Sequence, residues 1–320
     1  MFGTLMRLRR PAATLALAGA LLFAGAPRAD AETFDQRLEA GARHRYTITN
    51  RFAPTLHQPT RGDSRTIVEA TMEVTIAVLS ADRGRMVLRV RVDKLDFEFL
   101  DFGSGAVIGL QFDDDDDPEM DMRNPGATLR SFVGQVFEVL VDGKISSVQL
   151  RDIVWPLLPE DNAGNIMKRL IGEGLLAHSL SWIVGLPPVD ADLAPGDAFS
   201  DEVLVRFPGD GEVAFLPAFL FDGVEDDRAA FTIGGEVAYT DNRSPLAMVT
   251  GRQPMTIDAS TLSGAAVWRT DLGALESLEL TASATLEPDP LDPLGRRIER
   301  KSIEESFIIR RIEPAEAGAE

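Results

Sequence analysis

Long stretches of this sequence alternate apolar and polar residues one by one, and this alternation constrains the fold more than any other feature. In SRTIVEATMEVTIAVLS, residues 64–80, every second position from Val68 to Val78 is apolar, and the positions between them up to residue 75 are Glu69, Thr71, Glu73 and Thr75. Successive side chains of a β-strand point to opposite faces, so this spacing predicts one long strand with one face buried and the other in water.

The next run, MVLRVRVDKLDFEFLDF, residues 86–102, keeps the alternation but changes its phase. Apolar residues occupy even-numbered positions up to Val92 and odd-numbered positions from Leu95 onward. One extra residue in a strand turns every following side chain to the other face, and a β-bulge supplies such a residue. The sequence therefore predicts a bulge or a bend between Val92 and Leu95.

Other runs with the same alternation predict further strands. They lie around residues 45–52, 106–112, 135–150, 198–207, 212–221, 228–240, 261–270, 274–286 and 296–312. Within the third of these, Asp142-Gly143 separates two apolar runs and predicts a tight hairpin. Because the strands are long and one-sided, we expect a mainly β fold, with a large antiparallel curved sheet or open barrel of about a dozen strands.

One segment breaks the two-residue period. In NAGNIMKRLIGEGLLAHSLSWIVGLPP, residues 162–188, apolar residues follow helical spacing until Gly185 and Pro187. We expect a helical insertion at about residues 160–185 within a single mostly β domain, residues 32–320; a domain boundary near Pro187 is the alternative. The helix either fills the core or lines an apolar cavity between itself and the sheet.

The N-terminal region has the pattern of a secretory signal peptide. Arg7, Arg9 and Arg10 precede an apolar stretch that is shorter than a spanning helix needs, and Ala29-Asp30-Ala31 follows it. We therefore expect residues 1–31 to be removed, leaving an exported protein without a membrane span. The chain contains no cysteine, which excludes disulfides, thiolate metal sites and a lipidated cysteine.

The charge of the chain is strongly acidic. The full sequence has 32 basic and 51 acidic residues; without residues 1–31 it has 28 and 50, a net charge near −22. Such a charge repels nucleic acids and anionic lipid surfaces, and it favours basic partners or cations.

The acidic run QFDDDDDPEMDMRNPG, residues 111–126, is the most conspicuous candidate for a cation site. In the best register for an EF-hand loop, however, Pro118 takes the glycine position and Asn124 takes the position of the bidentate glutamate. We interpret residues 113–121 as a solvated loop between strands, and calcium binding there as the open alternative. Asp113 itself is expected to close the preceding strand.

The histidines and the known catalytic motifs give no site. His44 is expected beside the first strand, His57 in a proline-flanked loop and His178 in the apolar helix, and no two of them have metal-ligand spacing. We interpret His178 as a partly buried helix histidine with a local hydrogen bond rather than a catalytic residue. Because no nucleophile elbow, zinc-binding helix, phosphate loop or dinucleotide fingerprint occurs, we predict no catalytic, cofactor-binding or metal-binding residue.

Five features occur along the chain: GARHRYTI, the pair Phe112-Asp113, VGQVFEVLVDGKISSV, LPPVDADLAPGDAFSDEV and GAAVWRTDLGALESLEL. Together they resemble an uncharacterised family of bacterial secreted proteins, domain-of-unknown-function family 6263. The resemblance implies export but brings no established activity or site. The order of elements is also similar, more weakly, to periplasmic carriers of lipids and lipoproteins, in which a curved antiparallel sheet wraps helices.

These observations favour a periplasmic or secreted, non-enzymatic protein that binds an apolar small molecule, a lipid or an envelope partner. The alternative is a structural or interaction protein whose acidic surface binds a basic envelope component. A hydrolase is the least favoured class, since no motif supports it. We expect no cofactor and no nucleic acid partner.

Overall fold

The structure is a computed structural model of the chain. It describes residues 31–34, 38–58, 62–82, 85–113, 129–142, 148–153, 173–187, 191–201, 203–207, 211–240, 255–288 and 300–313. All of these belong to one compact unit, Ala31–Glu320. The predicted signal peptide up to Asp30, the acidic run from Asp114 onward and residues 162–172 of the helical insertion lie outside the described residues.

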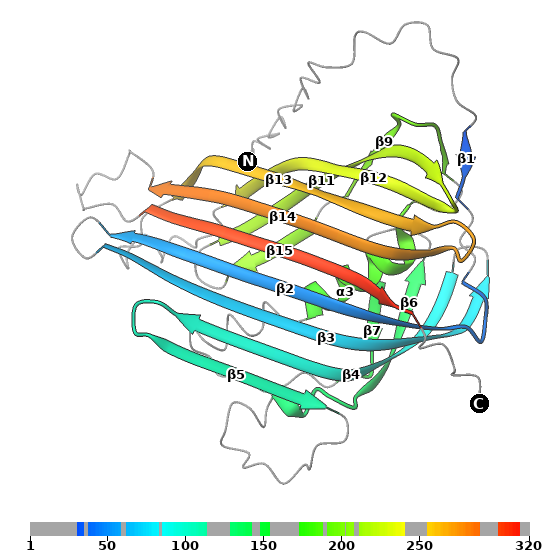
Figure 1. Cartoon of the computed structure of the whole chain (residues 1–320), viewed down its shortest axis with the longest axis horizontal. Coiled ribbons are helices and arrows are strands. Elements are labelled where there is room, and N and C mark those ends of the chain that lie inside the picture. The colour runs from blue at the N-terminus through cyan, green and yellow to red at the C-terminus, as the bar shows by residue number, and fades with distance from the viewer. Residues whose placement is uncertain are drawn as a thin grey trace, which may run out of the picture. The chain divides into compact units, whose positions relative to one another are not determined.

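Thirteen of the described strands form one sheet (Figure 1). They are β2 (Arg43–Gln58), β3 (Gly62–Asp82), β4 (Arg85–Asp101), β5 (Ala106–Asp113), β6 (Val136–Asp142), β7 (Val148–Arg151), β9 (Ala198–Ser200), β10 (Val203–Phe207), β11 (Gly211–Glu225), β12 (Arg228–Thr240), β13 (Met255–Arg269), β14 (Ala274–Pro288) and β15 (Arg300–Ile312). Two short strands, β1 (Glu32–Thr33) and β8 (Asp192–Leu193), pair with each other. The predicted mainly β class with one large antiparallel sheet is confirmed.

The sheet is an antiparallel meander whose path runs β10-β11-β12-β13-β14-β15-β2-β3-β4-β6-β7, with β5 paired to β4 and β9 to β11. The last long strand, β15, pairs along its whole length with the first, β2. Because the strands nearest the two chain ends pair in the middle of the path, the two ends of the path, β10 and β7, come from the middle of the chain. No pairing between them occurs among the described strands, so the sheet is curved but not closed.

The helix α3 (Glu173–Gly185) lies where the two ends of the sheet approach each other. It packs against β7 and β10, the two end strands, and against β14 in the interior. Figure 1 shows α3 behind the front strands, on the inner side of the sheet. Almost every described residue from Leu176 to Pro187 is buried, so the helix acts as a core element between the two ends.

Contacts between distant strands show how strongly the sheet curls. Phe215 on β11 and Phe307 on β15 lie four strands apart along the sheet, a path of about 19 Å at the usual strand spacing. Their ring centroids are only 6.0 Å apart. The inner faces of the two strands therefore turn toward each other around a shared core.

The predicted irregularity in β4 is a bulge at Asp93. Glu73 of β3 pairs with Lys94 and the next residue, Val74, pairs with Val92, which leaves Asp93 as the extra residue. Val92 and Leu95 are both completely buried although they differ in parity. The bulge thus keeps the apolar side chains on the inner face along all of β4.

Two local predictions were wrong. The strands β6 and β7 form a hairpin, but Val141 pairs with Val148, so six residues separate this pair where a turn at Asp142-Gly143 would leave two. A turn dipeptide alone did not determine the register. His57 lies in β2, paired with Asp63 of β3, and not in a loop, because β2 continues past Pro54 to Gln58.

Candidate functional site

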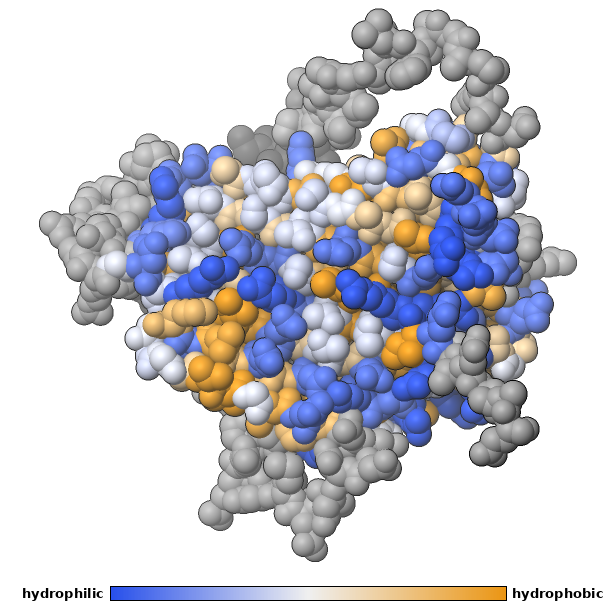
Figure 2. Space-filling model, viewed as in Figure 1, coloured by the Kyte–Doolittle hydropathy of each residue, from blue (hydrophilic) through white to orange (hydrophobic). Residues whose placement is uncertain are grey.

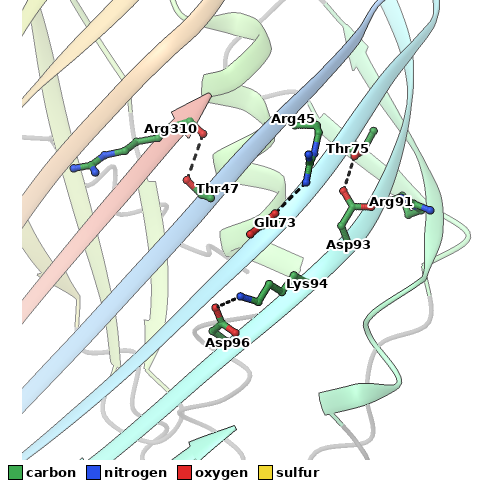
Figure 3. Close-up of polar contacts among 9 residues, drawn as sticks. All are labelled: Arg45, Thr47, Glu73, Thr75, Arg91, Asp93, Lys94, Asp96 and Arg310. Atoms are coloured by element: carbon green, nitrogen blue, oxygen red, sulfur yellow. Dashed lines mark hydrogen bonds and ion pairs between the residues drawn. The ribbon is translucent and has the colours of Figure 1, made fainter. Parts of the chain in front are cut away.

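The two faces of the sheet differ sharply in polarity. On the outer face, polar side chains form hydrogen bonds and ion pairs within and between strands, which Figure 3 shows for β2, β3 and β4, and Thr47 of β2 donates to the backbone oxygen of Arg310 on β15. Arg45 contacts Glu73 at 3.2 Å, the Thr75 hydroxyl donates to Asp93 at 2.5 Å, and Lys94 contacts Asp96 at 3.1 Å. The view of this face in Figure 2 is mostly hydrophilic. The outer face is thus suited to water.

The inner face is apolar, with one exception in its middle. Among the described strands, only β2 and β15 carry buried polar side chains, which are His44, Asn50 and Glu305. We call these three residues the central polar stripe. The strands on either side present only apolar buried side chains to the core, such as Met72, Leu88, Leu280 and Phe231.

The stripe lies at the middle of the curved sheet. The strands β15 and β2 are the sixth and seventh of the eleven strands on the path, and α3 spans the two ends. Asn50 pairs with Phe307, and Glu305 pairs with Phe52 two residues further along β2. Asn50 and Glu305 are therefore diagonal neighbours on one face, about 7 Å apart.

Asn50 is the most unusual member of the stripe. Its side chain is 1% exposed, and neither Nδ2 nor Oδ1 has a hydrogen-bond partner among the described residues. Its cross-strand neighbours are Ala70 on β3 and Phe307 on β15, neither of which has a polar side chain. A buried polar group without a partner costs about 1–3 kcal/mol of stability. An apolar residue at position 50 would therefore be expected to stabilise the fold, which makes Asn50 a candidate for a functional role.

His44 occupies the end of the stripe and is also unpartnered. The side chain is buried, and both ring nitrogens lack a hydrogen-bond partner within the described part of the chain. Burial lowers the pKa of the imidazole below its ordinary value, and the positive charge of Arg311 lowers this pKa further. Both effects favour the neutral form of His44 in the folded protein.

Tyr46 lies between these two residues on β2 but is satisfied. Its hydroxyl donates to the carbonyl oxygen of Leu275 at 3.0 Å, which links β2 to the start of β14 across β15. Burial raises the pKa of the phenol well above its ordinary value. The donor of this side chain is therefore already used in a contact between β2 and the start of β14.

The helix contacts the strand β15, next to the stripe, through Trp182. The ring of Trp182 lies 6.0 Å from that of Phe307, the residue paired with Asn50. Its Nε1 donates to Oδ2 of Asp201, between β9 and β10, at 3.1 Å. This contact holds α3 next to β10, one of the two end strands of the sheet.

His178 joins the same cluster. Its Nε2 lies 3.5 Å from Oδ2 of Asp201, and its ring packs edge-on against Trp182. The predicted partly buried position in a helix is confirmed, but the contact is with Asp201 rather than a local hydrogen bond. The hydroxyl of Ser181 donates to the backbone oxygen of His178 and not to its ring. The described contacts thus join His178 to a carboxylate but to no nucleophile.

His57 takes part in a contact pattern that sequence reasoning missed. On the outer face its Nε2 lies 2.9 Å from Oγ of Ser302, and its Nδ1 lies 3.0 Å from Oδ1 of Asp63. These are the contacts of a serine–histidine–aspartate array. The three positions are brought together only by the pairing of β2 with β3 and β15, which no motif in the sequence encodes.

The surroundings of Ser302 do not fit acyl transfer. Such chemistry needs free backbone N–H donors beside the nucleophile. Ser302 lies on a strand that is paired on both sides, with Thr285 of β14 and Thr55 of β2 opposite it. The ladders therefore use the nearby N–H groups, and the array belongs to the outer row of polar pairs.

Two hollows are lined by described residues. One, of about 460 Å³, lies over β3, β4 and β5, with Glu69, Asp96 and Glu98 in its lining. The other, of about 300 Å³, lies beside Trp268 and Asp271. The apolar cavity expected between the sheet and residues 162–184 stays a prediction, because residues 162–172 are outside the described part.

Within the described residues, no group of three acidic or histidine side chains could hold a metal ion. The acidic run from Asp114, where calcium binding was left open, is not among these residues, so that alternative stays open. No described helix is long and apolar enough to cross a membrane. Asp113 ends β5, as predicted.

Comparison with known proteins does not identify a family. No protein-family model matches the chain, so the resemblance to family 6263 is unconfirmed. A comparison with curated proteins also found no match.

Solved structures share only a distant likeness with the chain. Lipovitellin, studied for its lipid–protein interactions, is 11% identical over 88% of this chain, with a TM-score of 0.44, and this chain covers 26% of its length. An outer membrane channel from Pseudomonas putida F1 is 7% identical, with a TM-score of 0.26 and coverage of 87% and 97%. DynF from the dynemicin pathway of Micromonospora chersina is 10% identical, with a TM-score of 0.22 and coverage of 89% and 85%. Scores this low carry no argument about function.

Proposed function

We propose that this protein binds an apolar molecule on the inner face of its sheet, with the polar end of that molecule at the central polar stripe. The observation that carries the proposal is Asn50, a buried amide whose donor and acceptor groups are both unpartnered among the described residues. Ligand sites are mostly apolar surfaces with a few placed polar groups. The inner face, with its stripe, has this composition.

The position of α3 supports binding between the helix and the sheet. The helix touches both ends of the open sheet and the residue paired with Asn50. Because the sheet is not closed by strand pairing, a shift of α3 opens a route to the stripe without breaking a ladder. The proposed binding role is non-catalytic, and its proposed place is the periplasm or the exterior, where the signal-peptide pattern would send the chain.

Mass spectrometry of an organic extract tests this function. The protein is purified without detergent from the compartment to which it is exported, and an aliquot is denatured and extracted with organic solvent. A cysteine-free β protein of similar charge, purified and extracted in the same way, is the control. We expect at least one apolar compound at a molar ratio near one that is missing from the control extract. No enriched compound, together with no binding of added long-chain alcohols, amides or acids, would exclude the proposal.

A second candidate function rests on the outer hollow over β3, β4 and β5. Glu69 and Glu98 face each other directly in adjacent strands, where like charges are unfavourable, and Arg51 lies 3.9 Å from Glu69 on its other side. Val107 and Ile108 of β5 are 72% and 48% exposed beside this hollow, and Figure 2 shows apolar side chains gathered over the β4–β5 end. A basic envelope partner with an apolar segment would suit both features.

A pull-down from envelope extract tests this second candidate. We expect any such partner to be lost when Glu69 and Glu98 are both changed to glutamine, and to be weakened at about 0.5 M salt because screening is strong there. The control variant is Glu138→Gln, an outer-face glutamate of β6. Capture that is unaffected by salt and by the double change would exclude docking at this hollow.

A further inference from the structure

The strand β5 is an edge of the sheet that is not protected in the usual ways. It pairs with β4 in a regular register from Ala106 to Asp113, and no second strand pairs with it among the described strands. Natural edge strands are commonly protected by lysines, prolines or bulges, and the segment AVIGLQF has none of these. Within the described part of the chain, β5 therefore has an edge to which another strand can pair.

The side chains at the start of β5 are apolar and in contact with solvent. Val107 is 72% exposed and the next residue, Ile108, is 48% exposed. Because neighbouring side chains of a strand point to opposite faces, the two residues expose apolar surface on both faces of the sheet. Figure 2 shows apolar side chains gathered at this end of β4 and β5. An added strand with apolar side chains would cover this surface.

Three rows of directly paired residues cross β3, β4 and β5 on the outer face. They are Ile67, Leu100 and Val107; Glu69, Glu98 and Gly109; and Thr71, Asp96 and Gln111. The first row is apolar, the second is acidic and ends in a glycine, and the third is polar. A strand added to β5 extends each row by one residue, because directly opposed residues lie on the same face. The rows therefore indicate which side chains such a strand should carry.

The acidic row lacks a cation at its β5 end. Glu69 lies 3.9 Å from Arg51 of β2, whereas Glu98 has no hydrogen bond or ion pair among the described residues. The space next to Glu98 is open, because a Cβ added at Gly109 would meet nothing within 4 Å. A hollow of about 460 Å³ is lined by all three residues of this row.

A basic side chain on an added strand can reach Glu98 through this space. The added strand would lie two strand spacings, about 10 Å, from β4. A lysine or arginine and a glutamate together span this distance when the residue between them is a glycine. The row would then alternate in charge, with a cation at each end of the two glutamates.

We propose that β5 binds an extended segment of a partner protein as an added strand, with a lysine or arginine opposite Gly109 and an apolar residue opposite Val107. This step rests on the second candidate function given above, in which a basic partner docks at the outer hollow. A second copy of this chain is a poorer occupant, because residues 106–113 include no basic residue and the two copies are both strongly acidic.

Matched peptides test the proposal on the full exported chain. The probe is a short fluorescein-labelled peptide with the core valine, threonine, lysine, threonine, valine, which reads the same in either strand direction. Its binding is measured by fluorescence anisotropy at low salt. Replacing the lysine by glutamate should weaken binding at least about tenfold, because attraction to Glu98 becomes repulsion. Equal binding of the two peptides, or no binding of the lysine peptide up to about 1 mM, would overturn the proposal.

Backbone N-methylation distinguishes strand addition from docking at the hollow alone. Alternate residues of a strand direct their N–H groups to the same edge, so methyl groups on one alternate set block the edge that faces β5. We expect one set to weaken binding at least about tenfold and the other set less than about threefold. Equal effects of the two sets would show that the peptide does not bind as an added strand.

A glycine variant tests the position of the site. Gly109→Lys places a cation beside Glu98 and should weaken binding of the lysine peptide at least about tenfold. Gly234→Lys on β12 is the matched control, since a Cβ there also meets nothing within 4 Å, and it should change the affinity less than about twofold. Unchanged binding by Gly109→Lys would place the site elsewhere.

The outcomes separate strand addition from the second candidate function. If capture of a partner depends on Glu69 and Glu98 but the two N-methylated sets act equally, docking at the hollow stands and strand addition fails. If neither a partner nor the peptide binds, both fail. Dimers of the wild type that the peptide dissociates would assign the edge to a second copy and overturn the basic partner. Since the peptide series is measured on the wild type, the decision does not depend on the folding of any variant.

Discussion

The outer and inner faces of this sheet are built from the same strands, yet their side chains contribute very different amounts to stability. On the outer face, exposed ion pairs such as Arg45–Glu73 each contribute about 0–1 kcal/mol. On the inner face, a fully buried Val, Leu or Phe contributes about 1.5–3 kcal/mol. The stability of the fold therefore comes mainly from the inner face. A polar residue buried there without a partner lowers this stability, and a binding function would explain why it is present.

The largest expected contrast comes from placing one aspartate on each face of β3. Ile76 is buried on the inner face, so Ile76→Asp buries an unpaired charge and should destabilise by more than about 4 kcal/mol or prevent folding. Ala77, the next residue, lies on the outer face between Arg43 and Arg89. Ala77→Asp should change the free energy of unfolding by less than about 1 kcal/mol.

Urea unfolding followed by circular dichroism checks this pair. The effect of Ala77→Asp should also shrink as salt is added, because its arginine neighbours are exposed to solvent. Similar losses of stability in the two variants would show that the faces are not distinguished as the structure has them.

An intermediate effect is expected from the contact that anchors α3. Asp201→Ala leaves the buried Nε1 of Trp182 without its acceptor and should lower the free energy of unfolding by about 2 kcal/mol. Asp201→Asn, which keeps an oxygen at the same place, should lose less than half of that. Tryptophan fluorescence in a urea titration measures both, and an unchanged midpoint for Asp201→Ala would mean that this contact does not anchor the helix.

A smaller effect is expected from His44. Its pKa is lowered in the folded state, so below about pH 6.5 the unfolded chain takes up a proton that the folded chain resists. The free energy of unfolding should therefore fall as the pH drops from 6.5 to 5, by up to about 1.4 kcal/mol per pH unit. His44→Leu should flatten this slope in thermal unfolding, whereas His57→Gln on the outer face should leave it in place. A slope that survives His44→Leu would assign it to other groups.

The smallest effect is expected at Ser302. Because we interpret its contacts with His57 as part of the outer polar row, Ser302→Ala should change stability by no more than about 1 kcal/mol. A fluorophosphonate probe should not label the wild-type protein. Labelling that disappears in Ser302→Ala would show an activated serine and revive the hydrolase interpretation.

The alternation of residues was sufficient to predict the long strands and the buried face of most of their length, but not the short strands β1 and β8 or the extension of β2 to Gln58. The phase change between Val92 and Leu95 predicted the bulge at Asp93, because a bulge is the local solution that keeps apolar side chains inward. The end of the helix at Gly185 followed from its glycine and the prolines after it. In each of these cases the cause lies within a few residues of the effect.

The candidate site depends on long-range pairing, which local patterns do not encode. Asn50 has the same parity as Ile48 and Phe52, and Glu305 the same parity as Phe307, so their inward orientation could have been found from the sequence. Their proximity could not, because it requires the pairing of the first long strand with the last. The same pairing brings Ser302 to His57, and the register of β6 with β7 was likewise missed.

The free energy of unfolding of Asn50→Leu, measured with and without oleyl alcohol, tests the binding role of the inner face most directly. Without the alcohol, the variant should be more stable than the wild type by about 1–2 kcal/mol, because an unpartnered buried amide has been removed. With the alcohol, the wild type should gain stability in proportion to its affinity and the variant should gain much less. A variant that is less stable than the wild type and gains equally from the alcohol would contradict a ligand-binding role for Asn50.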